Sequence, residues 1–237
     1  MKNLNQFITE YIIKKKLDKP IDSEHKYHPN SKEELIKNIQ ELINNKIYDF
    51  NCIDTREITD MSKLFYNKIF NNINKLNFDV SGWDVSNVIN MSEMFNNCNS
   101  FDCDLSDWNV SKVEDMEYMF VSCKNFTGIG LENWNVSNVK NMEAMFANCK
   151  KFTGNTIENW DVSNVVSARN MFYKCENLDC DLSNWNVSNV KDISFMFYNC
   201  YNFNCDLSKW NIKNVKYTNE MFENCKLLKK LPSWYKN

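Results

Sequence analysis

The sequence predicts an α/β repeat fold, a solenoid in which short helices and the strands of a parallel sheet alternate along a stack of coils. An α-helical cap is expected at its N-terminal end. Two observations predict this fold. From Trp83 onward tryptophan recurs at steps of 24 to 26 residues, and within each step the apolar residues follow first a helical and then an alternating spacing. One such unit cannot bury its apolar side alone, so it must stack on its own copies.

Several residue types keep a fixed distance from each tryptophan. Valine or isoleucine follows by two positions, valine by five, a Met-Phe pair by 11 and 12, and cysteine by 15. The tryptophans are Trp83, Trp108, Trp134, Trp160, Trp185, Trp210 and Trp234. The cysteines of this column are Cys98, Cys123, Cys149, Cys175, Cys200 and Cys225. A less regular copy begins at Ile53, so we expect about seven coils of 25–26 residues with atypical coils at the ends.

Each coil is predicted to contain a short helix followed by a short strand. Over residues 113–123 the apolar positions follow helical spacing, Ser111 can cap the first turn, and Glu114 completes a capping box. Residues 101–106 alternate apolar and polar side chains, which is typical of a strand. The residue after every tryptophan of the repeat up to Trp210 is Asp or Asn, which favours a turn between strand and helix.

The first 50 residues lack the repeat and differ from it in composition. Residues 1–17 show the spacing of an amphipathic helix, and residues 18–30 contain two prolines and are expected to form a loop. A capping box from Ser31 to Glu34 opens a second helix, which is predicted to end near Lys46. These helices are expected to cap the N-terminal end of the stack.

The predicted domain organisation has three parts. Residues 1–50 form the helical N-terminal capping region, residues 51–231 form the repeat solenoid, and residues 232–237 form a C-terminal tail. Residues 227–235 are expected to cover the last coil.

The repeat resembles that of a known family. Its pattern, W-[DN]-V-S-x-V-x-x-M-x-x-M-F-x-x-C-x-x-F-x-x-D-L-S, is similar to that of the BspA-like, DUF285-type leucine-rich-repeat proteins from about Ile53 to Leu231. The resemblance implies a leucine-rich-repeat-like, right-handed coil stack with a binding or adhesive role and no enzymatic activity. It also implies a location on a bacterial or mycoplasmal surface, and some such proteins are encoded by phages or hosts.

The ten cysteines leave three interpretations open: buried free thiols, disulfides or a metal site. Pairs such as Cys98 and Cys103 are five residues apart, which fits no common zinc spacing. A ladder of free thiols inside the stack explains the column best, because free cysteine behaves as a small hydrophobic residue. With no signal peptide at the N-terminus, this favours a cytoplasmic or otherwise intracellular protein, and the surface location is the alternative.

Composition and motifs disfavour several classes of function. The net charge is −3 and no basic stripe accompanies a groove-reading motif, so nucleic acid is not an expected partner. No segment is apolar enough to predict stable membrane insertion, although Lys14–Lys16 could touch a membrane surface. With only four glycines there is no phosphate-binding loop, and neither histidine has a nucleophile at motif spacing. We therefore expect no enzyme, no cofactor and no metal.

Acidic side chains on the predicted strands are the candidate binding site. They are Asp79, Asp102, Asp104, Glu132, Glu158, Asp179, Asp181 and Asp206. Strands stack about 4.8 Å apart, so Asp181 and Asp206 would lie side by side, and one carboxyl would tend to keep its proton. Three interpretations remain: local hydrogen bonds to backbone, docking of a basic protein surface, and Ca²⁺ binding.

Tyrosines form a second candidate surface. Tyr118, Tyr173, Tyr198, Tyr201 and Tyr217 lie mostly on the helical side, where they could anchor a partner or only pack the helices. The sequence thus predicts a non-enzymatic protein-interaction module that binds a protein partner through the extended strand face, with a basic protein as one candidate. The alternative is an intracellular small-molecule or ion-binding protein that acts by sequestration, for example against a defence system. Neither interpretation predicts an oligomeric state.

Overall fold

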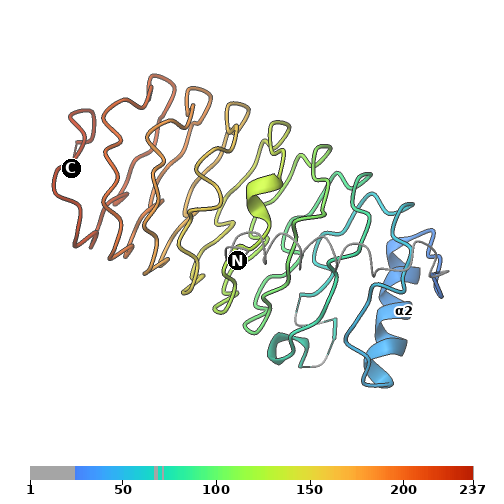
Figure 1. Ribbon diagram of the computed structural model, residues 1–237. Helices are drawn as coiled ribbons and strands as arrows, with labels where there is room; N and C mark the ends of the chain where they lie inside the picture. Colours follow the sequence, from blue (N-terminus) through green and yellow to red (C-terminus); the bar gives the residue numbers. More distant parts are fainter. Residues whose placement is uncertain (1–24, 67–68, 71, 237) are drawn as a thin grey trace, which may run out of the picture.

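The computed structural model describes residues 25–66, 69–70 and 72–236, which form a row of coils stacked side by side (Figure 1). Helix α2 (Lys32–Asn44) lies at one end of the row and the C-terminus at the other (Figure 1). The helix predicted over residues 1–17 lies outside the described residues.

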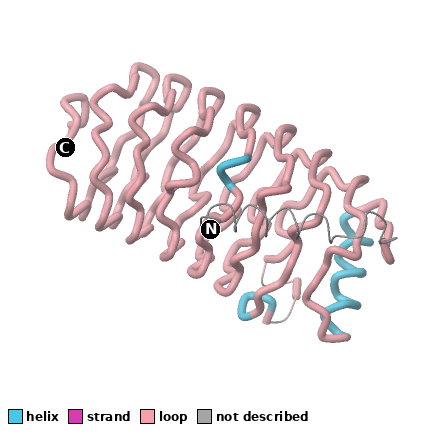
Figure 2. The backbone as a smooth tube through the Cα atoms, in the orientation of Figure 1, coloured by secondary structure: helices cyan, strands magenta, loops and turns pink. Residues whose placement is uncertain are grey.

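The predicted parallel sheet and the short helix in every coil are wrong. Besides α2, the described residues contain only two 3₁₀ helices, η1 (Ile73–Lys75) and η2 (Leu131–Asn133), and no strand; the coils are drawn as loops in Figure 2. Neighbouring coils meet at isolated parallel bridges, one residue wide. Along the repeats these bridges join Asp60, Asn90, Asp115, Asn141, Ser167, Asp192 and Tyr217 in succession.

Left-handed residues explain why the Met-Phe segments are not helices. Each segment is a run of overlapping tight turns, as in the bonds from the Met94 N–H to the Met91 carbonyl and from the Asn96 N–H to the Glu93 carbonyl. Two residues four positions apart have positive φ in each of the six coils from Trp83 onward. They are Glu93 and Asn97, Tyr118 and Ser122, Ala144 and Asn148, Asn170 and Lys174, Phe195 and Asn199, and Glu220 and Asn224. A left-handed residue cannot continue a right-handed helix.

Alternate N–H groups of these runs of turns donate to the next coil, while the N–H groups between them donate within their own coil. Glu93 donates to the Glu117 carbonyl at 2.7 Å and Phe95 to the Met119 carbonyl at 2.9 Å, and the same pattern recurs from coil to coil. An α-helix would use these N–H groups within one segment. Between coils they satisfy the buried backbone and set the spacing of the stack.

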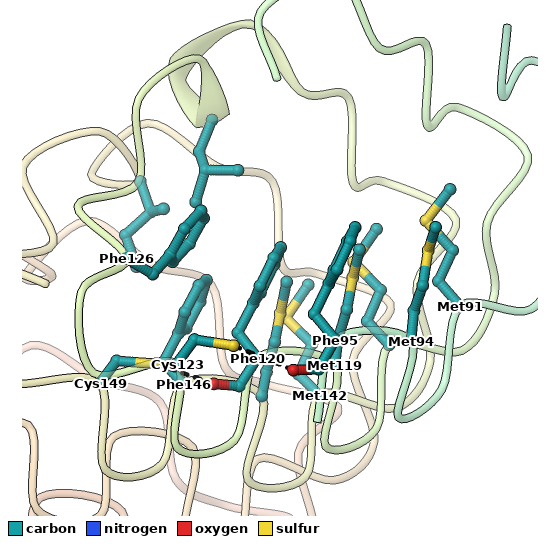
Figure 3. Packing of buried hydrophobic residues seen from close by; sticks show 14 of the residues in the cluster. Met91, Met94, Phe95, Met119, Phe120, Cys123, Phe126, Met142, Phe146 and Cys149 are labelled. Atoms are coloured by element: carbon teal, nitrogen blue, oxygen red, sulfur yellow. Dashed lines mark hydrogen bonds between the residues drawn. The ribbon is translucent and has the colours of Figure 1, made fainter. Parts of the chain in front are cut away.

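Apolar columns of the repeat form one continuous core. The indole of Trp134 stacks on those of Trp108 and Trp160 at 6.2 Å, and Phe120 stacks on Phe95 and Phe146 at 5.4 and 5.7 Å. Figure 3 shows these phenylalanines in a row beside the methionines and thiols. The prediction that the tryptophans face inward is confirmed, because those from Trp83 to Trp210 are each at most 5 % exposed.

Polar atoms inside the core tie each coil to the one before it. The Trp134 indole N–H donates to the Leu105 carbonyl at 3.1 Å, and the Cys149 thiol donates to the Phe120 carbonyl at 2.9 Å. The same two bonds recur from Trp83 to Trp234 and from Cys98 to Cys225. All ten cysteines are free, which confirms the thiol ladder.

Helix α2 covers the first coil, and its start confirms the predicted N-cap at Ser31, while Glu34 reaches back to the residue before the cap. The Ser31 hydroxyl accepts from the Glu34 N–H at 3.2 Å, and the Glu34 carboxylate accepts from the Asn30 N–H at 2.8 Å. The helix buries Leu35, Ile39 and Leu42 in the core. It ends at Asn44, slightly before the predicted end.

The C-terminal segment covers the last coil only in part. Trp234 and Tyr235 pack against Phe222 at 6.3 and 5.0 Å, but Leu227 and Leu231 are 56 % and 42 % exposed. The expectation that residues 227–235 close this end is therefore only partly met. No helix in the described part of the chain has the length and apolar character needed to cross a membrane.

Candidate functional site

Four of the predicted acidic residues bind their own backbone. Asp79, Asp104, Asp181 and Asp206 each accept a hydrogen bond from the N–H two residues later, at 2.8 to 3.0 Å. The residues that follow tryptophan make the same turn, as Asn109 does with the Ser111 N–H at 3.1 Å. Of the three interpretations of the acidic residues, these contacts fit the first, in which each carboxylate forms local hydrogen bonds to backbone. The serines donate to these turns and cap no helix.

The expected repulsion between stacked aspartates is not found. Hydrogen bonds from the Ser183 hydroxyl and N–H and from the Cys205 thiol hold the pKa of Asp181 below its usual range. Bonds from the Ser208 N–H and hydroxyl lower the pKa of Asp206 in the same way. Both carboxylates are therefore charged at neutral pH, because the turns stabilise the ionised form.

The other four acidic residues make hydrogen bonds of other kinds or are exposed. Asp102 accepts from the Thr127 N–H and hydroxyl at 2.9 and 2.7 Å, and Glu158 accepts from the Asp181 N–H at 2.9 Å. Glu132 accepts from the Gly130 N–H at 3.1 Å within its own coil. Asp179 is exposed. One oxygen of each of Asp102, Glu132 and Glu158 is thus engaged by backbone or side-chain groups of its own or the next coil.

Metal-ligand types do not cluster in the described residues. Across residues 25–66, 69–70 and 72–236, no three His, Cys, Asp or Glu side chains are grouped to hold a metal ion. Burial raises the pKa of the Cys175 thiol to about 12, so this buried cysteine is held as the neutral thiol.

A second surface lies on the outer side of the runs of turns. We call it the turn face, and it consists of the outward residues 9, 10 and 13 positions after each tryptophan. A hollow of about 350 Å³ opens in its middle. This aromatic hollow is lined by Tyr118, Val121, Ala144, Ala147, Arg169, Asn170, Tyr173 and Phe195.

Alternation of small and large side chains in two columns produces the hollow. Ala144 and Ala147 form its floor, at 3 % and 7 % exposure, while the neighbouring coils carry larger residues in the same columns. On the C-terminal side the wall is braced, because the ring of Tyr173 stacks on that of Tyr198 at 5.1 Å. Aromatic walls around a small floor are typical of sites that receive a partner's side chain.

Charges flank the aromatic hollow. On the N-terminal side the Tyr118 hydroxyl donates to the Glu143 carboxylate at 3.0 Å. Desolvation, and next this bond, raise the pKa of Tyr118 to about 12, so the hydroxyl keeps its proton. Burial, and then repulsion from Asp115, Glu143 and Glu93, raises the pKa of Glu117. Among the residues that line the hollow, Arg169 is positively charged and exposed.

Glu117→Gln is expected to stabilise the fold slightly at neutral pH. Because the folded state raises the pKa of Glu117, its contribution to stability is largest at low pH and is lost as pH rises through the folded pKa. The amide removes that penalty and keeps an oxygen for Asn141, which donates to Glu117 at 3.2 Å. Since solvent screens this site, we expect a gain of no more than about 0.5 kcal/mol in urea unfolding at pH 7. The gain should vanish below about pH 4. A loss of stability at pH 7 would contradict this account.

Only part of this surface was visible in the sequence. Tyr118 and Tyr173 stood out as aromatics at variable positions, but helical geometry was assumed for their segment. The signal that could have found the hollow is the pair of alanines at positions that carry large residues in other coils.

Comparison with known proteins identifies a family. A family model described as "Mycoplasma protein of unknown function, DUF285" matches residues 31–130 and residues 123–234. No curated protein and no solved structure matches the chain.

Proposed function

The chain belongs to the DUF285 family, and from this premise we propose that it is a protein-interaction module that holds a partner on its turn face. The binding role implied by the narrower resemblance to BspA-like proteins supports this proposal. Ten free cysteines support a reducing, intracellular compartment for it.

The observation that carries the proposal is the aromatic hollow. Tyr118, Tyr173 and Phe195 are each partly exposed, although the adjacent core columns are dry. Tyrosine is enriched among residues that dominate binding energy, since it offers a large contact area at little cost in conformational entropy. A partner would insert one apolar or aromatic side chain between these rings.

Flanking charges define the rest of the partner. Glu117 and Glu143 lie beside the hollow, and burial, followed by repulsion from Asp115, Glu143 and Glu93, raises the pKa of Glu117. A basic side chain on the partner would relieve this repulsion on binding. We therefore propose a partner that presents an apolar anchor next to a lysine or arginine.

Ala147→Tyr tests the proposal by filling the hollow. The same column carries Tyr173 and Tyr198, so the coil should accept the larger ring. We expect affinity purification from the native cell, with mass spectrometry, to recover a stoichiometric partner with the unchanged chain. With Ala147→Tyr, recovery should fall by at least about tenfold, equivalent to the loss of one anchor contact.

Asn96→Tyr is the matched control, because it places the same ring in the same column outside the hollow. It should recover the partner as well as the unchanged chain does. If Ala147→Tyr recovers the partner equally well while remaining folded, the hollow is not the contact.

A further inference from the structure

The last described coil has open backbone donors. In the preceding coil the N–H groups of Ile193, Phe195 and Asn199 donate to the next coil at 3.0, 2.8 and 2.8 Å. The corresponding groups of the last coil belong to Thr218, Glu220 and Asn224. None of these three N–H groups has a partner within the described part of the chain. The Phe222 N–H between them faces the Tyr235 hydroxyl.

A backbone acceptor is open beside these donors. The Lys191 carbonyl accepts from the Lys216 N–H at 2.8 Å, and the same bond links the earlier coils. The Lys216 carbonyl lacks such a donor among the described residues. Lys216, Thr218 and Glu220 therefore present an acceptor followed by two donors, which is a template for an added segment.

The apolar columns also end uncovered at this coil. Val187 and Val190 of the preceding coil are 3 % and 1 % exposed, whereas Ile212 and Val215 in the same columns are only partly buried. Tyr217 beside them is 56 % exposed. An added segment could cover these side chains as the next coil does elsewhere.

This end of the molecule is basic. Between Trp210 and the C-terminus the acidic residues are Glu220 and Glu223 alone. The lysines from residue 209 onward are Lys209, Lys213, Lys216, Lys226, Lys229, Lys230 and Lys236. In the interior of the stack, Lys140 pairs with Glu114 of the neighbouring coil at 2.6 Å. Lys216 occupies the same column as Lys140, so a carboxylate on an added segment could form an ion pair with it.

A second copy of the chain does not fit this end. Two copies meeting at their last coils would bring their lysines against one another. Addition to the first coil of another copy is blocked by α2, whose Lys32 binds Asp60 and Ser62 of that coil at 3.1 and 2.8 Å. The occupant must therefore be a different segment, acidic and able to offer carbonyl oxygens.

We propose that the last coil is a docking site for an acidic polypeptide segment, which adds to the stack as one further partial coil. Its backbone pairs with Lys216, Thr218 and Glu220, its apolar side chains cover Ile212 and Val215, and its carboxylates meet Lys213 and Lys216. This site lies at the last coil, away from the aromatic hollow, and it stands whether or not the hollow binds a partner.

A synthetic peptide with the sequence of residues 107–118 is the probe, because this segment already pairs in this way inside the stack. There Asp115 and Glu117 accept from Met91 and Glu93 at 2.9 and 2.7 Å, and the Glu114 N–H donates to the Ile89 carbonyl at 2.8 Å. Isothermal titration of the full chain should detect binding. A peptide with all four of its acidic side chains replaced by amides should bind at least about tenfold more weakly.

Protein variants and hydrogen exchange complete the test. Lys213→Glu with Lys216→Glu should weaken binding by at least about tenfold, whereas Lys124→Glu with Lys151→Glu, an equal change of charge at exposed sites, should not. The peptide should slow exchange of the Thr218 and Glu220 amides. No binding, equal binding of the amide peptide, or unslowed amides would overturn the proposal. Preferential binding of vesicles containing anionic phospholipid, or self-association of the chain through this coil, would overturn it as well.

Discussion

Trp134→Ala is expected to lower the free energy of unfolding by about 3–5 kcal/mol. The indole is 4 % exposed, lies between Trp108 and Trp160 at 6.2 Å from each, and donates to the Leu105 carbonyl at 3.1 Å. Alanine would leave a cavity in the middle of the stack and remove the bond from the indole to the Leu105 carbonyl, which would keep only its bond from the Trp108 N–H at 3.2 Å. Urea denaturation followed by circular dichroism measures the loss.

Trp134→Phe is the control for the two contributions. It keeps an aromatic ring in the stack but removes the indole N–H, so we expect a loss of about 1–2 kcal/mol. Near-neutral behaviour of Trp134→Ala would show that the indole is not part of the core.

Gly130→Ala is expected to destabilise the fold by about 3–5 kcal/mol, because two costs add at this position. Gly130 has a φ of 91°, which L-residues rarely adopt. An added Cβ would lie 2.2 Å from the Ser106 backbone nitrogen and 2.6 Å from the Leu105 carbonyl carbon. Backbone atoms of a stacked coil cannot move aside as the end of a side chain can, so the contact between the two coils must open.

Gly82→Ala provides the comparison in the same assay. Its Cβ would meet only the Asn51 side chain, at 3.0 Å from Oδ1, and its φ is not positive. We expect a loss of less than about 1 kcal/mol. Equal losses for the two glycine variants would refute the argument from coil-to-coil contact at Gly130.

Residue spacing predicted the core of this protein but not its secondary structure. Val113, Met116, Met119 and Cys123 fit helical spacing, and they are all buried as predicted. The same spacing also suits a run of tight turns with left-handed residues at Tyr118 and Ser122. The spacing of the apolar residues indicates which side chains face inward. A helix and a run of tight turns both place these side chains on one side of the backbone.

The predicted strands failed for a related reason. Asp104 was assigned to an alternating strand, but its carboxylate binds the Ser106 N–H at 3.0 Å and bends the chain into a turn. Asn109 was assigned to a turn and makes one. Asp104 and Asn109 make the same local hydrogen bond. They were predicted differently only because the residues around Asp104 alternate between apolar and polar.

Candidate sites were the least predictable part. The sequence identified the acidic residues but not their hydrogen bonds to backbone, because these bonds depend on the path of the coil. The aromatic hollow depends on Ala144 and Ala147 lying between Tyr118 and Tyr173 on neighbouring coils. The open amides of the last coil are invisible in a sequence, because every residue there has the same N–H group.

By itself, the sequence determined the length of the repeat, the inward columns of tryptophan, Met-Phe and cysteine, and the N-cap of α2, because each follows from side-chain chemistry at a fixed spacing. Only the tertiary structure decided where the backbone N–H groups go. Alternate N–H groups of each run of turns bind the next coil, because neighbouring coils offer carbonyl oxygens in register. The result is stacked turns in place of helices and strands, and the last coil keeps N–H donors that no described residue accepts.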